Sequence, residues 1–143
     1  MPKVSIIIPV YKTEAFIEKC ARSLFEQTFK DIEYIFVNDA TPDNSIDILE
    51  KVISEYPERK NNCFVVNHAK NKGLAAARNS GLAAATGEYV IHCDSDDWIH
   101  PSMIADMYHA AIEHQADIVS CDFQMVYADK TVYYQTTDWN EEK

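Results

Sequence analysis

Apolar runs alternate with segments of helical periodicity along most of this chain. The apolar runs are rich in β-branched residues, which is typical of buried strands, and they fall at 4–10, 34–37, 63–66, 89–93 and 118–121. The other segments carry apolar residues on one helical face, and they fall at 16–25, 46–53, 74–86 and 101–112. This alternation predicts an α/β fold with a mostly parallel central sheet and helices on both faces.

Local signals predict where these elements begin and end. Thr13 is expected to cap the first helix and Pro57 to end the second. Gly87 is expected just after the third helix, and Pro101 at the first position of the fourth. Beyond the fifth strand, residues 123–127 and 131–134 are predicted to pair as a hairpin, and the polar residues 136–143 to fray.

Composition narrows the class of protein. The 143 residues are 47% hydrophobic and 25% charged, which is ordinary for a globular domain, and the net charge is −10. An acidic surface argues against nucleic acid or an anionic membrane as the main partner. No apolar run is long enough to span a membrane, so we expect a cytoplasmic location. Attachment at the inner face of the membrane stays open.

The four cysteines are far apart in the sequence and form no C-x-x-C pair. Each lies in an apolar run or on an apolar helix face, so buried free thiols are favoured over disulfides or a zinc site. The cysteines concerned are Cys20, Cys63, Cys93 and Cys121.

A polar cluster follows each of the first four predicted strands. The clusters are Tyr11-Lys12, Asn38-Asp39, Asn71-Lys72-Gly73 and Asp94-Ser95-Asp96-Asp97. The carboxyl ends of parallel strands meet at one edge of the sheet, where ligands bind in open α/β folds. The clusters therefore predict one site at that edge.

The last cluster places three carboxylates within four positions, at the end of the apolar run 89–93. Such like charges repel one another unless a cation offsets them. Carboxylate oxygens suit Mg²⁺ or Mn²⁺, which commonly bridges one or two carboxylates and substrate phosphates. Asp94 and Asp96 are the candidate ligands, Ser95 offers a small side chain and its N–H, and Asp97 braces the turn. A solvated acidic turn is the alternative interpretation.

Several other side chains have two interpretations each. Asp39 is either an acceptor for a base or ribose, or a turn former. Arg78 is a charged residue among many alanines, so its side chain needs a partner. That partner is either a bound anion or base, or a structural carboxylate. Tyr11 either stacks on a base or simply packs. Asp43 is interpreted as a helix cap, and His92 as a core histidine with satisfied hydrogen bonds.

Taken in order, four stretches resemble motifs of the family-2 glycosyltransferases, which have the GT-A fold. They are Ser5–Tyr11, the opening strand; Val37–Ser45, similar to V-D-D-G-S-x-D-x-S/T; Asn71–Gly81, similar to N-x-G-x-x-x-A-R-N-x-G; and Asp94–Asp97, similar to D-x-D. Two departures fall in the second motif, where Asn38 replaces the usual Asp and Ala40 the usual Gly. Asp39 stays in place.

The resemblance implies an enzyme that transfers a sugar, with inversion, from a nucleotide-diphosphate donor, most simply a UDP-sugar, with Mg²⁺ or Mn²⁺ as cofactor. By this resemblance Pro9, Tyr11 and Asp39 hold the base with Arg78 near it, Asp94 meets the ribose or a metal-bound water, and Asp96 meets the metal. The full set of expected donor-binding residues is Pro9, Val10, Tyr11, Asp39, Lys72, Arg78, Asp94 and Ser95, with Asp94 and Asp96 as metal ligands.

The resemblance also implies a catalytic base in a later part of the domain, which this chain does not match. We therefore expect residues 1–127 to be the donor-binding half, and 128–143 a hairpin return and tail that begin a missing acceptor half. The implied acceptor is a glycan or a lipid-linked molecule, as in polysaccharide biosynthesis. The identities of sugar and acceptor stay open, as does self-association into a homo-oligomer.

Two other functions stay open. A non-catalytic nucleotide-binding or scaffold fragment would use the same pocket without turnover. A metal-dependent phosphoryl-transfer enzyme ranks lower, because in the common aspartyl-phosphate enzymes D-x-D follows the first strand, whereas here that strand ends in Pro9-Val10-Tyr11.

Overall fold

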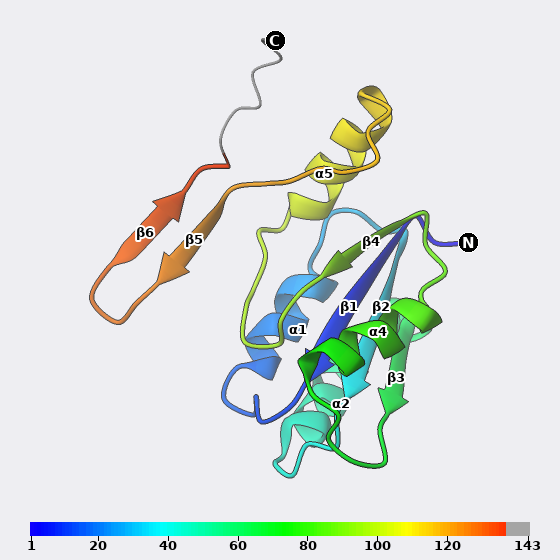
Figure 1. Cartoon of the computed structure of the whole chain (residues 1–143), viewed down its shortest axis with the longest axis vertical. Coiled ribbons are helices and arrows are strands. Elements are labelled where there is room, and N and C mark those ends of the chain that lie inside the picture. Colours follow the sequence, from blue (N-terminus) through cyan, green and yellow to red (C-terminus); the bar gives the residue numbers. More distant parts are fainter. Residues whose placement is uncertain (137–143) are drawn as a thin grey trace. The chain divides into compact units, whose positions relative to one another are not determined.

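Four parallel strands in the order β3-β2-β1-β4 form the central sheet of this protein (Figure 1). The structure is a computed structural model that describes residues 1–136. It divides into two units, Met1–Ile104 and the residues from Ala105 onward. The α/β class and the parallel sheet predicted from the sequence are confirmed.

The elements of the first unit follow one another as the alternating pattern predicts. They are β1 (Val4–Val10), α1 (Ile17–Phe25), β2 (Ile32–Asn38), α2 (Ser45–Glu55), α3 (Pro57–Lys60), β3 (Cys63–Asn67), α4 (Leu74–Ala84) and β4 (Tyr89–His92). Helix α5 (Met103–Glu113) continues into the second unit, where β5 (Phe123–Val126) pairs antiparallel with β6 (Thr131–Tyr134). The predicted hairpin is thus confirmed.

The two central strands are buried on both faces because helices cover both. Successive side chains of a strand point to opposite faces. On one face Tyr34 and Phe36 of β2 pack edge-on against Phe25 of α1, with ring centroids 5.1 and 6.3 Å apart. On the other face Ile35 and Val37 cluster with Ala77 of α4. All seven residues of β1 are buried.

Helix α4 lies very close to the sheet, as its small residues predict. A Cβ atom added at Gly81 would stand only 2.3 Å from Cγ2 of Ile7 in β1, so no larger residue fits without a shift. Gly87 is also needed for a close approach, since an added Cβ there would meet the backbone N of Ser5 at 2.7 Å. These contacts fix α4 over the middle of the sheet and therefore fix its N-terminal end at the sheet's edge.

Three of the four predicted element ends need correction. Thr13 is not the cap of α1, because the helix begins at Ile17 and the Thr13 carbonyl accepts N–H groups from the intervening turn. Helix α2 ends at Glu55, two residues before Pro57, as predicted, and Pro57 then begins the short helix α3. Helix α4 ends at Ala84, three residues before Gly87. Pro101 lies in a turn before α5.

The predicted burial of the later strands is also wrong in part. β3 and β4 are the outer strands of the sheet, so their side chains are only partly covered; Val90 is 40% exposed, and His92 is exposed rather than a core histidine. No strand forms at 118–121, where Ile118 is 87% exposed. The predicted fraying at 136–143 falls, from residue 137 onward, outside the described residues.

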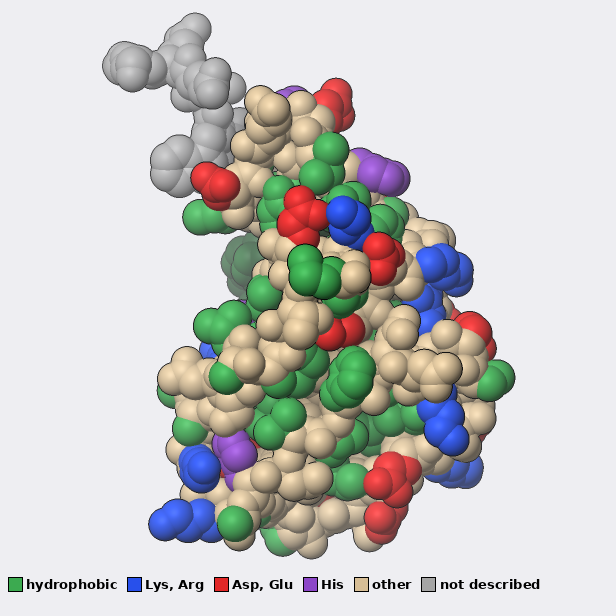
Figure 2. All heavy atoms as spheres, turned by 90° about the vertical axis from the view of Figure 1, so that its right-hand side faces the viewer, with side chains coloured by type: hydrophobic (Ala, Val, Ile, Leu, Met, Phe, Trp, Pro, Cys, Tyr) green, Lys and Arg blue, Asp and Glu red, His purple; other side chains and the backbone are tan. Residues whose placement is uncertain are grey.

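Apolar side chains also reach the surface on the side of the molecule seen in Figure 2. Those exposed on β3 and α4 include Phe64, Val65, Leu74 and Leu82. Cys20 and Cys93 are buried free thiols as predicted, but Cys63 is only half-buried and Cys121 is exposed, because the strand expected around it is absent. No helix within residues 1–136 combines the length and apolar character needed to cross a membrane.

Candidate functional site

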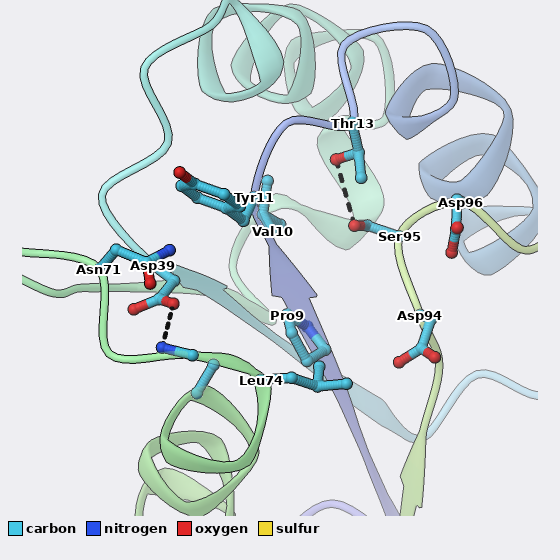
Figure 3. Close-up of a pocket in the computed structure, with 12 residues that line it drawn as sticks. Pro9, Val10, Tyr11, Thr13, Asp39, Asn71, Leu74, Asp94, Ser95 and Asp96 are labelled. Atoms are coloured by element: carbon cyan, nitrogen blue, oxygen red, sulfur yellow. Dashed lines mark hydrogen bonds between the residues drawn. The ribbon is translucent and has the colours of Figure 1, made fainter.

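A pocket with a cavity volume of about 410 Å³ opens at the carboxyl edge of the sheet (Figure 3). Its walls come from the segments that follow all four strands. The lining residues are Pro9, Val10, Tyr11, Thr13, Asp39, Asn71, Gly73, Leu74, Ala77, Asp94, Ser95 and Asp96. The carboxyl edge of an open parallel sheet is where ligands bind in such folds, as the sequence analysis expected.

The pocket brings together most of the residues singled out from the sequence. Of the predicted site residues, only Lys72 and Arg78 are outside the lining; each contacts a lining carboxylate instead. The predicted donor-binding residues left out five lining residues, although Asn71 and Gly73 belong to a polar cluster that was placed at this edge. The five are Thr13, Asn71, Gly73, Leu74 and Ala77. Three of these begin or precede α4 within the motif at 71–81, so their place in that motif was the available signal.

Asp39 lies almost fully buried at the end of β2, with 3% of its surface exposed. Its Oδ1 accepts hydrogen bonds from His68 Nδ1 at 2.7 Å and from the backbone N–H of Lys72 at 2.8 Å. Its Oδ2 accepts one from the backbone N–H of Gly73, also at 2.8 Å (Figure 3). Gly73 caps α4, so the carboxylate stands at the positive end of that helix dipole.

Hydrogen bonding keeps this buried carboxylate ionised. Burial by itself would raise the pKa of Asp39, but the hydrogen bonds from His68, Lys72 and Gly73 outweigh it and lower the pKa below the ordinary value. The N-terminus of α4 is therefore neutralised by a side chain of the protein and does not stand free for a bound anion.

Two non-glycine residues adopt left-handed backbone conformations beside the pocket. Lys12 has φ +54° after β1, and Ala40 has φ +56° after β2. Lys12 donates its N–H to Thr41 Oγ1 at 2.8 Å, and Thr41 donates its own to Asn38 Oδ1 at 3.0 Å. The turns that carry Tyr11 and Asp39 are thus tied together.

The two departures from the family's second motif both fall in this turn. The side-chain carbonyl of Asn38 accepts the Thr41 N–H, and a carboxylate oxygen of Asp could accept the same hydrogen bond. The side-chain amide nitrogen of Asn38 donates to Asn67 Oδ1 at 2.9 Å, which Asp could not do. Ala40 holds a conformation that glycine adopts at lower cost. Neither departure alters the contacts of Asp39.

Asp94 begins the acidic turn and pairs with Arg78 of α4 across 2.7 Å, from Nη2 to Oδ1. Both side chains are about two-fifths exposed, at 41% and 38%. Of the two partners considered for Arg78, the structure contains the structural carboxylate. Nε of Arg78 is buried and has no hydrogen-bond partner among the described residues.

Ser95 and Asp96 complete the turn. The Ser95 hydroxyl is buried and donates to Thr13 Oγ1 at 3.1 Å, which fixes the turn to the segment after β1. Asp96 is exposed, and Figure 3 shows its carboxylate and that of Asp94 on the side of the pocket opposite Asp39. The neighbouring Asp97 has a raised pKa, first from burial and then from the charges of Asp96 and Asp94.

The acidic turn fits a divalent cation only as a partial ligand set. Within residues 1–136, no group of three or more His, Cys, Asp or Glu side chains could hold a metal ion. Asp94 and Asp96 supply hard oxygen donors from one turn, which matches the way Mg²⁺ and Mn²⁺ use one or two carboxylates together with substrate phosphates. The ligand set would be complete only with a phosphorylated substrate in place.

Asp43 acts as a cap, in agreement with the prediction. Its Oδ1 accepts the backbone N–H of Ser45, the first residue of α2, at 3.1 Å, and the hydroxyls of Ser45 and Thr41 at 2.6 and 2.7 Å. Burial alone would raise the pKa of Asp43, but these hydrogen bonds lower it to about 2. Asp43 does not line the pocket.

A sequence profile of the family "Glycosyl transferase family 2" matches residues 5–143. The chain belongs to this family. The chain is also similar to the uncharacterized glycosyltransferase EpsJ of Bacillus subtilis, to which it is 43% identical over 133 residues, which are 93% of this chain and 37% of EpsJ.

Solved structures of glycosyltransferases share the GT-A fold of this family-2 chain. Residues 1–349 of TarS from S. aureus, in complex with UDP, superimpose with a TM-score of 0.73 at 33% identity, over 80% of this chain and 33% of that TarS chain. The mannosyltransferase PcManGT of Pyrobaculum calidifontis, in complex with GDP-Man and Mn²⁺, superimposes with a TM-score of 0.68 at 26% identity. The match covers 85% of this chain and 34% of the PcManGT chain. The family-2 chain spans about a third of the length of these relatives.

Proposed function

We propose that this chain is the donor-binding part of a glycosyltransferase that uses a UDP-sugar together with Mg²⁺ or Mn²⁺. The observation that carries the proposal is a single pocket with an ionised, buried acceptor, Asp39, on one side and the carboxylates of Asp94 and Asp96 on the other. A nucleoside diphosphate has the complementary layout, since its base offers N–H donors and its diphosphate attracts a cation.

The free acceptor positions of Asp39 favour uracil as the base. A carboxylate has about four lone-pair positions. Three of them are taken, two on Oδ1 and one on Oδ2, so a single position on Oδ2 is left for a ligand. Uracil offers one imide N–H on its edge, whereas guanine offers adjacent donors that need two acceptors. Tyr11, which is 41% exposed at the pocket, supplies a ring face for the base.

Asp94 and Asp96 would hold the cation, which when bound neutralises charge on the diphosphate as the sugar–phosphate bond breaks. Arg78 orients Asp94 through the ion pair, and Thr13 orients the turn through Ser95. Two sets of related structures support the proposal. TarS has been solved in complex with UDP and with UDP-GlcNAc, which supports the nucleotide, and PcManGT in complex with Mn²⁺, which supports the cation.

Transfer with inversion to an acceptor hydroxyl is part of the same proposal for the whole protein. The resemblance implies that the base which deprotonates the acceptor lies in a later part of the domain, beyond what residues 1–136 contain. The property to test on this chain is therefore donor binding. Nucleotide binding without turnover is the second candidate function for this chain.

Calorimetric titration of UDP and of GDP, each with and without Mn²⁺, tests the proposal. We expect UDP to bind with a micromolar to millimolar Kd that improves when Mn²⁺ is present, and GDP to bind at least about tenfold more weakly. Equal affinity for UDP and GDP would contradict the role of Asp39. An absence of UDP binding both with and without Mn²⁺ would contradict the proposal as a whole.

A matched pair of variants assigns any binding to the pocket. Asp39→Asn replaces the acceptor oxygens in part and is expected to weaken UDP binding. Asp47→Asn removes the same charge from the exposed face of α2, outside the pocket, and is expected to leave UDP affinity unchanged.

A further inference from the structure

We propose that His68 is a positioning residue of the donor pocket, which fixes the orientation of Asp39 and thereby leaves one acceptor oxygen directed at the base. This inference rests on the proposed function. His68 follows β3, does not line the pocket, and has no metal-ligand spacing in the sequence. Its importance comes from the two hydrogen bonds of its ring.

Both ring nitrogens of His68 are bound to buried or half-buried side chains from other segments. Nδ1 lies 2.7 Å from Asp39 Oδ1, and Nε2 lies 2.8 Å from Ser80 Oγ on α4. The His68 side chain is only 4% exposed, so water does not compete for these bonds. The ring therefore connects the end of β2 to the middle of α4.

The hydrogen-bond chemistry fixes the tautomer of this ring. Asp39 is ionised because its pKa is lowered, so it can only accept. The proton between Asp39 and His68 must therefore be carried by Nδ1. In the neutral ring Nε2 then accepts from the Ser80 hydroxyl, which can either donate or accept, so the tautomer is set by Asp39.

The consequence for Asp39 follows from how its oxygens are occupied. Oδ1 accepts from both His68 and the Lys72 N–H, so its capacity is filled and its position is set. Oδ2 accepts only from Gly73 and keeps one position. Without the His68 donor, Oδ1 would keep only the Lys72 N–H, so each oxygen would have one open acceptor position and a base could bind at either.

The same helix reaches the other side of the pocket. Ser80 and Arg78 are two residues apart on α4, and Arg78 holds Asp94. Helix α4 thus supports the base side through His68 and the acidic turn through Arg78. On the base side the helix contacts Asp39 directly through the Gly73 N–H of its cap and indirectly through His68.

Two variants separate the bonds of the His68 ring. His68→Asn can place a side-chain N–H near the position of Nδ1, which keeps the donor to Asp39 and loses the bond to Ser80. His68→Gln can reach the position of Nε2, which keeps the bond to Ser80 and loses the donor to Asp39. We expect His68→Gln to weaken UDP binding by about tenfold or more and His68→Asn by about threefold or less.

Thermal unfolding of both variants, with the same UDP titrations, distinguishes positioning from simple stabilisation. Equal losses of UDP affinity in the two variants, or a loss that follows Tm rather than the retained donor, would overturn the proposal. So would an unchanged UDP affinity in both. If the wild-type chain itself fails to bind UDP, the proposed function fails first, and the two failures are distinguishable.

A spectroscopic measurement tests the same inference in the unmodified chain and needs no ligand. In ¹⁵N-edited NMR spectra at neutral pH, His68 is expected to carry its proton on Nδ1, whereas the exposed His92 serves as an internal comparison without such a partner network. A proton on Nε2 alone in His68 would contradict the assigned hydrogen bond and the proposal with it.

Discussion

Arg78 and Asp94 form an ion pair of 2.7 Å between α4 and the first residue of the acidic turn. The pair keeps one carboxylate of the D-x-D stretch facing α4, while the Asp96 carboxylate is left exposed. The two aspartates therefore differ in role: Asp94 is oriented by the protein, and Asp96 is available for a ligand.

Loss of the Arg78 side chain is expected to weaken binding of UDP with Mn²⁺. In Arg78→Met, Asp94 loses its ion-pair partner, and the acidic turn loses its connection to α4. We therefore expect the Kd for UDP with Mn²⁺, measured by calorimetry, to increase about fivefold to tenfold. Arg22→Met is the matched control, because it removes the same charge from a partly exposed pair with Glu18 and Glu55. Equal affinity loss in the two variants would show a general charge effect instead.

Ala40 holds a left-handed conformation in the turn after Asp39, and glycine should hold it at lower cost. We expect Ala40→Gly to leave the free energy of unfolding unchanged or to raise it by up to about 1 kcal/mol, because relief of strain is partly offset by the entropy of the unfolded chain. Urea denaturation measures the difference.

The control for this substitution is Ala83→Gly, on an exposed position of α4. Ala83 lies in the last turn of α4, where glycine is still less favourable than alanine, so this variant is expected to lose up to about 1 kcal/mol. Comparable destabilisation by both substitutions would contradict the strain assigned to Ala40.

Asp43 gives the protein a pH-dependent contribution to stability. Its pKa is about 2 in the folded chain against an ordinary 3.8, so its stabilising effect is present above the ordinary value and is lost as pH falls through about 2. Asp43→Asn should destabilise the chain at pH 7 by about 1–2 kcal/mol, a value reduced for solvent screening.

The measurement is the free energy of unfolding of both proteins as a function of pH. The difference between wild type and Asp43→Asn should narrow as pH falls below 3.8, because the carboxyl group is then protonated in the unfolded chain, and it should be lost once the folded chain is protonated near pH 2. A difference that stays constant down to pH 2 would mean that the hydrogen bonds of Asp43 do not depend on its charge.

The strands and the site edge could be predicted because both depend on local residue patterns. Buried β-branched runs such as 4–10 identify the central strands, and polar residues after several strands identify the carboxyl edge. Burial of β4 could not be predicted in this way, because an outer strand and a central strand of a parallel sheet have the same local pattern. The order of strands is set by packing between distant segments.

The roles of individual side chains depended on contacts distant in sequence. Composition left Arg78 with two kinds of partner, and only its position on α4 opposite Asp94 decided between them. His68 was passed over because its partner Asp39 is 29 positions away. The roles of Asp39 and Asp96 in donor binding came from the family resemblance, and they stay predictions until they are measured.

The central claim is that Asp96 completes a cation site only together with a diphosphate. The most direct test is to titrate UDP and uridine into the wild-type chain and into Asp96→Asn, each with and without Mn²⁺. We predict that Mn²⁺ strengthens binding of UDP but not of uridine, and that Asp96→Asn abolishes this increase while it leaves uridine binding intact. A Mn²⁺ effect on UDP that persists in Asp96→Asn would contradict the account.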